Sequence, residues 1–442
     1  MNSQIQNNSR AEASTAFTAS TASKVLIITY YWPPGSGAGV QRWLKFSKYL
    51  PEFGWEPVIL TVDPQYATYP STDLSLENEI SGDLKIFRTK ATDYFRLYNR
   101  DKNKIPSAGF ASDDNKSLIS KVKRFVRGNF FIPDPRRGWN KFAFTQACKI
   151  IEREGIQHIV TTSPPHSTQL IGLKLKKKYP YIKWIADLRD PWTDIYYYNQ
   201  FYPTFISTAI DRRYEKSVLD GADKIITVGK SLRELFVTKS PQIDNKTIII
   251  TNGYDEEDLK GIRSVIPLNF TISYVGTLSD AYPIGGFLKA VRELRSDGKD
   301  IYLRFIGAVS PSSRDIIRTT LADSGIEFIP YVEHPEALRQ MLSSNLLLLI
   351  IPDHVSNKSI ITGKIFEYMA TGKPILCLGP QNGDAACILK EAGSGNTYDY
   401  YDIEGLKFFI SQTINGEYSI RNPDTTAFSR RKIAGRLADF LK

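Results

Sequence analysis

The feature that most constrains the fold is a repeated alternation of short apolar runs with helical patterns. "KVLIITY" (24–30) and "EPVILTV" (56–62) have the β-branched, continuously apolar character of strands that are buried on both faces. Between them, apolar residues recur at helical spacing, at Val40, Trp43, Leu44 and Leu50. A strand, a helix and a second strand in this order predict a βαβ unit and a parallel sheet.

The alternation occurs in two successive sets. The first set continues through "QHIVTTS" (157–163), "IKWIADL" (182–188) and "DKIITV" (223–228). The second set begins at Phe270 with "FTISYVG" and ends with "LLLLII" and "PILCLG". A chain of 442 residues also exceeds the size at which a single core stops growing. The sequence therefore predicts an α/β protein with two Rossmann-like doubly wound domains, joined by a hinge near 245–268.

Outside these sets, the sequence suggests two terminal segments. Residues 1–23 are polar and lack the apolar core of a signal peptide, so we expect a disordered leader. The first domain is expected over 24–250 and the second over 251–424, and a last helical pattern covers 425–442. Three scattered cysteines form no CxxC pair, which favours a reduced, cytoplasmic setting without a zinc site.

The charge of the chain, +10, favours an anionic partner. Nucleic acid, a phosphate-bearing substrate and an acidic membrane surface all meet this description. No recognisable nucleic-acid-binding motif is present, so we rank a basic nucleic-acid-binding module last and expect no nucleic-acid partner. No apolar run approaches the length of a membrane span.

Each motif that carries potential ligand-binding residues follows a predicted strand. Open parallel sheets bind ligands outside the carboxyl ends of their strands, and two such domains would face each other across a cleft. The positions of the motifs therefore predict an enzyme with its site between the domains.

One helix in the second domain carries a cation at its unfavourable end. In "TGKIFEYMATGKPIL", Lys364 falls in the first turn, where the helix dipole repels positive charge. One interpretation is a surface ion pair with Glu367, three residues on. The other is a phosphate site, in which Lys364 meets a phosphate and Glu367 accepts hydrogen bonds from hydroxyls.

The same segment resembles the donor site of GT-B glycosyltransferases, particularly family 4 or group 1-like bacterial enzymes. Three further stretches are similar to the same group: "PPGSGAGVQRWLKFSKYLPEFGWEPVIL", "TTSPPHSTQLIGLKLKKKYPYIKWIADLRDPW", and "TNGYD" followed by "ISYVGTL". The resemblance as a whole extends over residues 24–442. The resemblance implies transfer of a sugar from a nucleotide-sugar, with retention of anomeric configuration, to a saccharide or lipid-linked saccharide in bacterial surface polysaccharide synthesis. It also implies a last helix that crosses back to the first domain.

The resemblance also implies roles for individual residues. The donor would contact Lys364, Glu367 and Thr277 in the second domain, with Gly37 and Gly39 under its phosphates. Two departures from the group's pattern matter. Ser359 stands where many members have a first glutamate, and Lys289 is the first cation after "VGTL", where members often have an Arg and a Lys. More of the diphosphate binding then falls to Lys364.

The catalytic assignment is divided between two residues of the first domain. His166 follows two prolines just after one strand, and Asp190 follows the next strand, in "DLRDPW". Either residue has a plain alternative as a helix-starting or turn residue. Arg42, Asp187 and Arg189 are expected to bind the acceptor, since an arginine flanked by carboxylates suits the orientation of hydroxyls.

A basic segment at 116–131 ("KSLISKVKRFVRGNFF") is amphipathic. It is either a solvated surface helix or an interfacial helix that touches anionic lipid, which would place the enzyme on the inner face of the membrane.

Two other kinds of enzyme are also consistent with the sequence. One is an epimerase of GT-B fold that uses the same nucleotide-sugars. The other is a nicotinamide oxidoreductase, since glycines follow the first strand and Asp63 ends the next, although the spacing is not Gly-x-Gly-x-x-Gly. No Asp-x-Asp motif is found where nucleotide chemistry would need it, so we expect neither a metal nor another cofactor.

Overall fold

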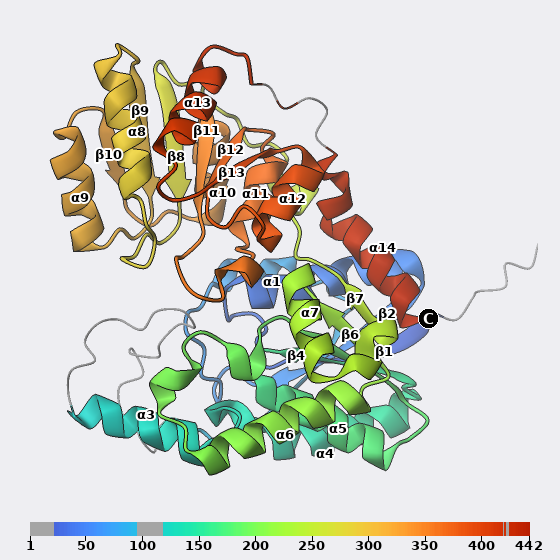
Figure 1. The fold of residues 1–442 in the computed structure, drawn as a ribbon. Coiled ribbons are helices and arrows are strands. Elements are labelled where there is room, and N and C mark those ends of the chain that lie inside the picture. The colour runs from blue at the N-terminus through green and yellow to red at the C-terminus, as the bar shows by residue number, and fades with distance from the viewer. Residues whose placement is uncertain (1–21, 95–117, 419, 421–423) are drawn as a thin grey trace, which may run out of the picture.

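The computed structural model describes residues 22–94, 118–418, 420 and 424–442. Within these residues the chain forms two α/β domains, each built on one parallel sheet (Figure 1). The leader expected over 1–23 lies outside the described residues except for its last two positions, and the first strand begins at Ser23. No helix in the described ranges is both long enough and apolar enough to span a bilayer.

The first domain contains a seven-stranded sheet in the order β3-β2-β1-β4-β5-β6-β7. All adjacent pairs are parallel, as the buried apolar runs predicted. The strands are β1 (Ser23–Ile28), β2 (Trp55–Val62), β3 (Lys85–Thr89), β4 (His158–Ser163), β5 (Lys183–Leu188), β6 (Lys224–Thr227) and β7 (Thr247–Ile249). The order reverses between β1 and β4, which is where doubly wound sheets bind ligands.

The second domain contains a six-stranded parallel sheet in the order β10-β9-β8-β11-β12-β13. Its strands are β8 (Phe270–Val275), β9 (Ile301–Ile306), β10 (Ile326–Ile329), β11 (Leu346–Ile350), β12 (Ile375–Leu378) and β13 (Gly395–Tyr398). The order reverses between β8 and β11. The predicted fold class, two doubly wound domains, is confirmed.

Helices cover both faces of each sheet. In the first domain they are α1 (Ala38–Tyr49), α3 (Leu118–Phe130), α4 (Asn140–Glu154), α5 (Gln169–Lys178), α6 (Phe205–Gly221) and α7 (Lys230–Lys239). In the second they are α8 (Gly285–Ser296), α9 (Pro311–Leu321), α10 (His334–Leu342), α11 (Lys364–Ala370), α12 (Asp384–Ala392) and α13 (Ile403–Ile414).

The last helix, α14 (Arg430–Leu441), follows the second domain in sequence but packs on the first (Figure 1). Its apolar residues Ile433 and Leu437 are buried in one cluster with Val25 and Ile27 of β1 and Trp43 of α1. The helix therefore belongs to the core of the first domain.

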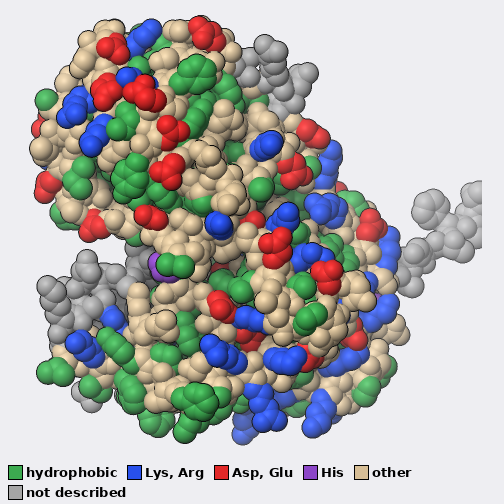
Figure 2. All heavy atoms as spheres, viewed as in Figure 1, with side chains coloured by type: hydrophobic (Ala, Val, Ile, Leu, Met, Phe, Trp, Pro, Cys, Tyr) green, Lys and Arg blue, Asp and Glu red, His purple; other side chains and the backbone are tan. Residues whose placement is uncertain are grey.

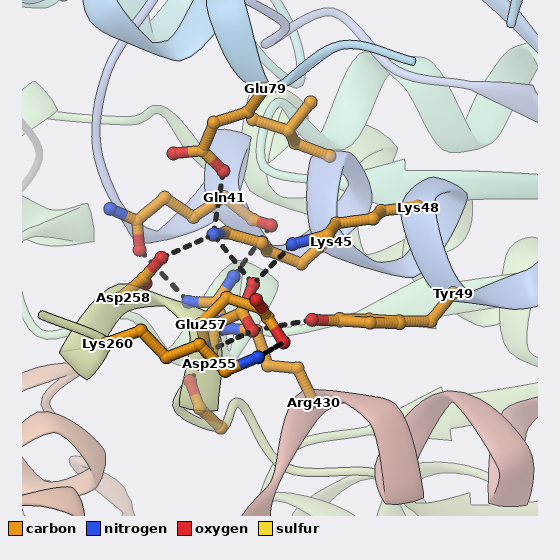
Figure 3. Close-up of polar contacts among 12 residues, drawn as sticks. Gln41, Lys45, Lys48, Tyr49, Glu79, Asp255, Glu257, Asp258, Lys260 and Arg430 are labelled. Atoms are coloured by element: carbon orange, nitrogen blue, oxygen red, sulfur yellow. Dashed lines mark hydrogen bonds and ion pairs between the residues drawn. The ribbon is translucent and has the colours of Figure 1, made fainter. Parts of the chain in front are cut away.

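A buried lysine joins the first domain to the segment that leads into the second (Figure 3). The ammonium nitrogen of Lys45, on α1, lies 2.7 Å from a carboxylate oxygen of Glu79 and 2.8 Å from those of Asp255 and Asp258. Burial by itself would lower the pKa of Lys45, but the carboxylates reverse this effect and raise it. Tyr49 donates a hydrogen bond of 2.5 Å to Asp255. This lysine cluster, formed by Lys45 and its three carboxylates, fixes the start of the second domain against α1.

Candidate functional site

The candidate site lies where the carboxyl ends of the two sheets meet. The glycine loop after β1 approaches the start of α11, because a Cβ atom added to Gly363 would lie 3.6 Å from the Cβ of Ala38. Farther along the interface the ring centroids of Tyr196 and His354 are 4.9 Å apart. Figure 2 shows the surface hollowed between the two domains on one side of the molecule. The motifs predicted after strands of both domains are thus brought to one interdomain region.

Lys364 points from α11 toward the end of β8. Its ammonium group donates a hydrogen bond of 2.8 Å to the hydroxyl of Tyr274, and this hydroxyl donates one of 2.6 Å to the carbonyl oxygen of Thr277. No carboxylate in the described residues forms an ion pair with Lys364. Burial lowers the pKa of the lysine to about 8, and the charge of Glu367 only partly opposes this effect. The site thus contains a desolvated cation with a neutral partner.

Gly276 makes this position of the lysine possible. It has a positive φ of 118°, and a Cβ atom there would lie 2.6 Å from Cε of Lys364. Only glycine combines this backbone conformation with so close an approach. Neither Gly276 nor Tyr274 was a sequence-based candidate, although a glycine directly after a buried strand is a signal for both close approach and a sharp turn.

Glu367 turns away from Lys364 and contacts α10. A carboxylate oxygen of Glu367 lies 3.3 Å from Nε2 of His334, and this hydrogen bond raises the pKa of His334. Both side chains are about one-third exposed. The surface Lys364–Glu367 ion pair considered from the sequence does not form, which leaves the lysine available to an anion.

Arg189 lies against the glycine loop of the first domain. A Cβ atom added to Gly39 would lie 2.9 Å from the terminal nitrogen Nη1 of Arg189, and Gly37, with a φ of 100°, precedes α1. Nε of Arg189 donates to the carbonyl oxygen of Ser163 at 3.0 Å. Its two terminal nitrogens have no hydrogen-bond partner in the described residues. Burial lowers the pKa of Arg189, while Asp187 raises it. A largely buried arginine, with 9% of its side chain exposed and its Nε 3.8 Å from a carboxylate oxygen of Asp187, therefore presents the end of its guanidinium group beside the loop.

Arg42 and Asp187 are placed differently from what their predicted role requires. Their side chains are 1% and 0% exposed, and they pair at 3.0 and 3.2 Å. Arg42 also donates to the carbonyl oxygens of Ile250 and Thr251, and Asp187 also accepts from Trp43. These contacts use both charged groups inside the core. The geometry favours a structural role for this pair over direct contact with a ligand.

The two catalytic candidates occupy the ends of β4 and β5. The imidazole of His166 stacks on Trp192 at 4.7 Å, and burial together with the charges of Arg189 and Lys239 lowers its pKa to about 3. It is therefore a neutral ring at physiological pH. Burial raises the pKa of Asp190, whose carboxylate forms no described hydrogen bond, while the charge of Arg189 opposes this rise. Of the two, Asp190 has the shift that suits a general base.

No protein-family model matches this chain, and no curated protein sequence matches it. Solved structures resemble it over nearly its whole length. A glycosyltransferase from Rickettsia africae is 13% identical and aligns with a TM-score of 0.57 over 95% of this chain and 98% of its own. HepE from Anabaena, solved with UDP and glucose, is 12% identical, with a TM-score of 0.56 over 94% and 98%.

A third similar structure is a putative UDP-N-acetylglucosamine 2-epimerase from Listeria monocytogenes. It is 13% identical, with a TM-score of 0.52 over 94% of both chains. Identities this low report on architecture only. The two facing parallel sheets and these full-length likenesses together show that the chain has the GT-B fold.

Proposed function

We propose that this protein is a glycosyltransferase that moves a sugar from a nucleotide-sugar to a saccharide or lipid-linked saccharide. The observation that carries the proposal is the buried, unpaired cation of Lys364 at the end of β8. The finer expectations are hexosyl transfer with retention, bacterial surface polysaccharide as the product, and a cytoplasmic location. The cytoplasmic location follows from the scattered cysteines and the other expectations from the sequence resemblance, and all are part of the proposal.

The leaving group best suited to the site is a diphosphate held from both domains. Lys364 is the first residue of α11, and the preceding Gly363 approaches Ala38 at the end of the glycine loop, while Arg189 lies against Gly39 of the same loop. Two desolvated cations near a glycine-rich loop match a small, doubly charged ligand. Arg189 would then supply the second cation that the sequence lacks after β8. The UDP in the similar HepE structure supports a nucleotide of this kind.

The residues of the site would have separate roles in the reaction. The bond between the sugar and the diphosphate breaks while Lys364 and Arg189 stabilise the charge that develops on the leaving oxygen. The acceptor hydroxyl forms the new bond, and its proton passes to Asp190 or to the leaving phosphate. Binding and orientation supply much of the acceleration. We expect turnover to continue in the presence of EDTA, because the proposal assigns no task to a metal.

A thermal-shift series with UDP, GDP, dTDP and NADH tests the donor site. At about 100 times its dissociation constant, the correct diphosphate stabilises the fold by about 2.7 kcal/mol. Lys364→Met and Arg189→Gln should each remove most of this shift. Lys289→Met is the matched control, because Lys289 is exposed on α8 and is the alternative diphosphate cation by sequence. Shifts with no diphosphate, or a loss only in Lys289→Met, would contradict the proposal.

Two assays separate the alternative enzymes. An epimerase converts the nucleotide-sugar to its epimer when no acceptor is present, whereas a transferase leaves it intact apart from slow hydrolysis. A shift with NADH and none with diphosphates would favour the oxidoreductase. The similar Listeria structure makes the epimerase the nearer alternative.

A further inference from the structure

Helix α3 is amphipathic, yet none of its residues is buried. Apolar and basic side chains alternate at helical spacing, so that they occupy opposite sides of the helix. Its large apolar side chains are instead exposed: Leu118 80%, Ile119 68%, Val122 58%, Phe125 42% and Phe130 69%. A helix that served only the core of the first domain would bury this side.

The beginning of α6 exposes further apolar side chains next to α3. Phe205 and Ile206 are 88% and 70% exposed. Asn129 of α3 ties the two helices together, since its side chain donates to the carbonyl oxygen of Tyr202 and accepts from Thr204 N at 2.7 Å. Figure 1 shows the end of α3 beside the start of α6. We call residues 118–130 and 205–213 the α3–α6 surface.

The charges on the α3–α6 surface have one sign. It carries six cations, and α3 contains no acidic residue; the cations are Lys121, Lys123, Arg124, Arg127, Arg212 and Arg213. The one carboxylate of the surface, Asp211, is buried and accepts hydrogen bonds from Trp192 and Tyr198. Figure 2 shows hydrophobic and basic side chains together along the lower edge of the first domain.

We propose that the α3–α6 surface binds the face of an anionic lipid bilayer. Exposed aromatic and aliphatic side chains beside lysines and arginines are the composition of a helix that lies in a membrane interface. Anionic headgroups attract such a surface by about 1 kcal/mol for each nearby cation. A second copy of this chain is a poor occupant, because it would bring the same positive charges together.

The α3–α6 surface is connected to the candidate site through a short segment. The guanidinium carbon of Arg127 lies 3.8 Å from the ring centroid of Phe201, and this ring packs against Tyr197 at 5.9 Å. Burial and the charge of Asp190 both raise the pKa of Tyr197. If the proposed function is correct, a bilayer docked here presents a lipid-linked acceptor to the first-domain side of the cleft.

Vesicle sedimentation tests the surface independently of catalysis. The wild-type protein should sediment at low salt with vesicles of phosphatidylcholine and phosphatidylglycerol, much less with phosphatidylcholine alone, and less at high salt. Two double variants should each bind at least about tenfold more weakly. Phe205→Ser with Ile206→Ser removes apolar contact, and Lys121→Glu with Arg124→Glu reverses charge.

The control is Phe408→Ser with Lys390→Glu, which changes an exposed aromatic and an exposed lysine of the second domain and should bind as the wild type does. Circular-dichroism melting curves check that every variant is folded. Absence of wild-type binding, or equal binding by all variants, would overturn the proposal. So would a concentration-dependent dimer that the surface variants abolish, because that result identifies a second copy as the occupant. The diphosphate shift is a separate readout, so the surface and the donor site can fail independently.

Discussion

At the scale of single residues, the site depends on a lysine whose buried charge lowers the stability of the unliganded protein. Lys364 sits in the first turn of a short helix, and burial lowers its pKa to about 8. Below this pH the folded protein carries a desolvated charge that the unfolded chain would hydrate freely. Lys364→Met should therefore raise the stability of the unliganded protein at neutral pH. Groups that are arranged for a ligand often reduce stability in its absence.

The same pKa predicts how nucleotide binding depends on pH. A diphosphate binds the protonated lysine, so affinity for the correct diphosphate should fall as the pH rises through about 8, when the free protein loses this charge. Lys364→Arg keeps its charge throughout this range and should show a flatter profile. Isothermal titration calorimetry between about pH 6.5 and about pH 9.5 checks both profiles. If the affinities of the two proteins depend on pH in the same way, Lys364 does not contact the phosphate.

The sequence indicates some of these residues better than others. Lys364 stands out because its charge opposes the helix dipole, and this conflict is readable without a structure. Arg42 and Asp187 look like exposed ligand-binding groups, because sequence alone does not show that both are buried and paired. Tyr274 has no sequence signal of its own. Its hydroxyl becomes relevant only because β8 and α11 adjoin at the switch point of the second sheet.

At the scale of elements, the Arg42–Asp187 pair joins three parts of the first domain. It links α1 to β5 and, through the carbonyl oxygen of Ile250, to the chain just after β7. Removing one member leaves the other charge buried without a partner. Asp187→Ala should cost about 3–5 kcal/mol of unfolding free energy, measured by urea denaturation.

The exposed pair of Arg431 with Glu52 is the matched control for this prediction. Arg431→Ala removes an ion pair that water already screens, so its cost should stay below about 1 kcal/mol. Similar costs for the two variants would mean that the buried pair contributes little.

Strands and helices differ in how well the sequence predicts their surroundings. The central strands are continuous β-branched runs, so their position and burial are both readable. The period of α3 predicts a helix, and the structure has one at Leu118–Phe130. Its exposure is not readable, because the same apolar stripe would suit a core helix. Only the exposed fractions of its side chains, which depend on how the described residues pack around it, show that the stripe faces outward.

At the scale of the whole molecule, the lysine cluster on α1 governs how the domains are joined. Burial raises the pKa of Asp255, but the hydrogen bonds from Lys45 and Tyr49 outweigh this effect and hold the pKa well below its usual range. Asp255 therefore contributes stability at neutral pH that is lost progressively as the pH falls from about 4, the pKa of an ordinary aspartate, through this lowered value. Lys45→Met should lower the melting temperature most at neutral pH, where three carboxylates are left facing each other. The deficit should shrink toward about pH 4, as the carboxylates take up protons.

Lys48→Met is the control for this effect. Lys48 is 35% exposed and contacts only Asp255 of the three carboxylates, at 3.2 Å. Its substitution should cost less and depend less on pH. A pH-independent deficit in Lys45→Met would indicate that the lysine acts through packing and not through its charge.

The return of α14 to the first domain also has a consequence for how the protein is made. The ribosome completes the strands of the first domain early, but Ile433, Leu437 and Leu441 fill the same core as Val25 and Trp43. At ordinary rates of translation, these residues emerge tens of seconds after β7. During that interval the nascent first domain has an uncovered apolar face, to which a chaperone can bind. Its native core closes only when the last helix has been synthesised.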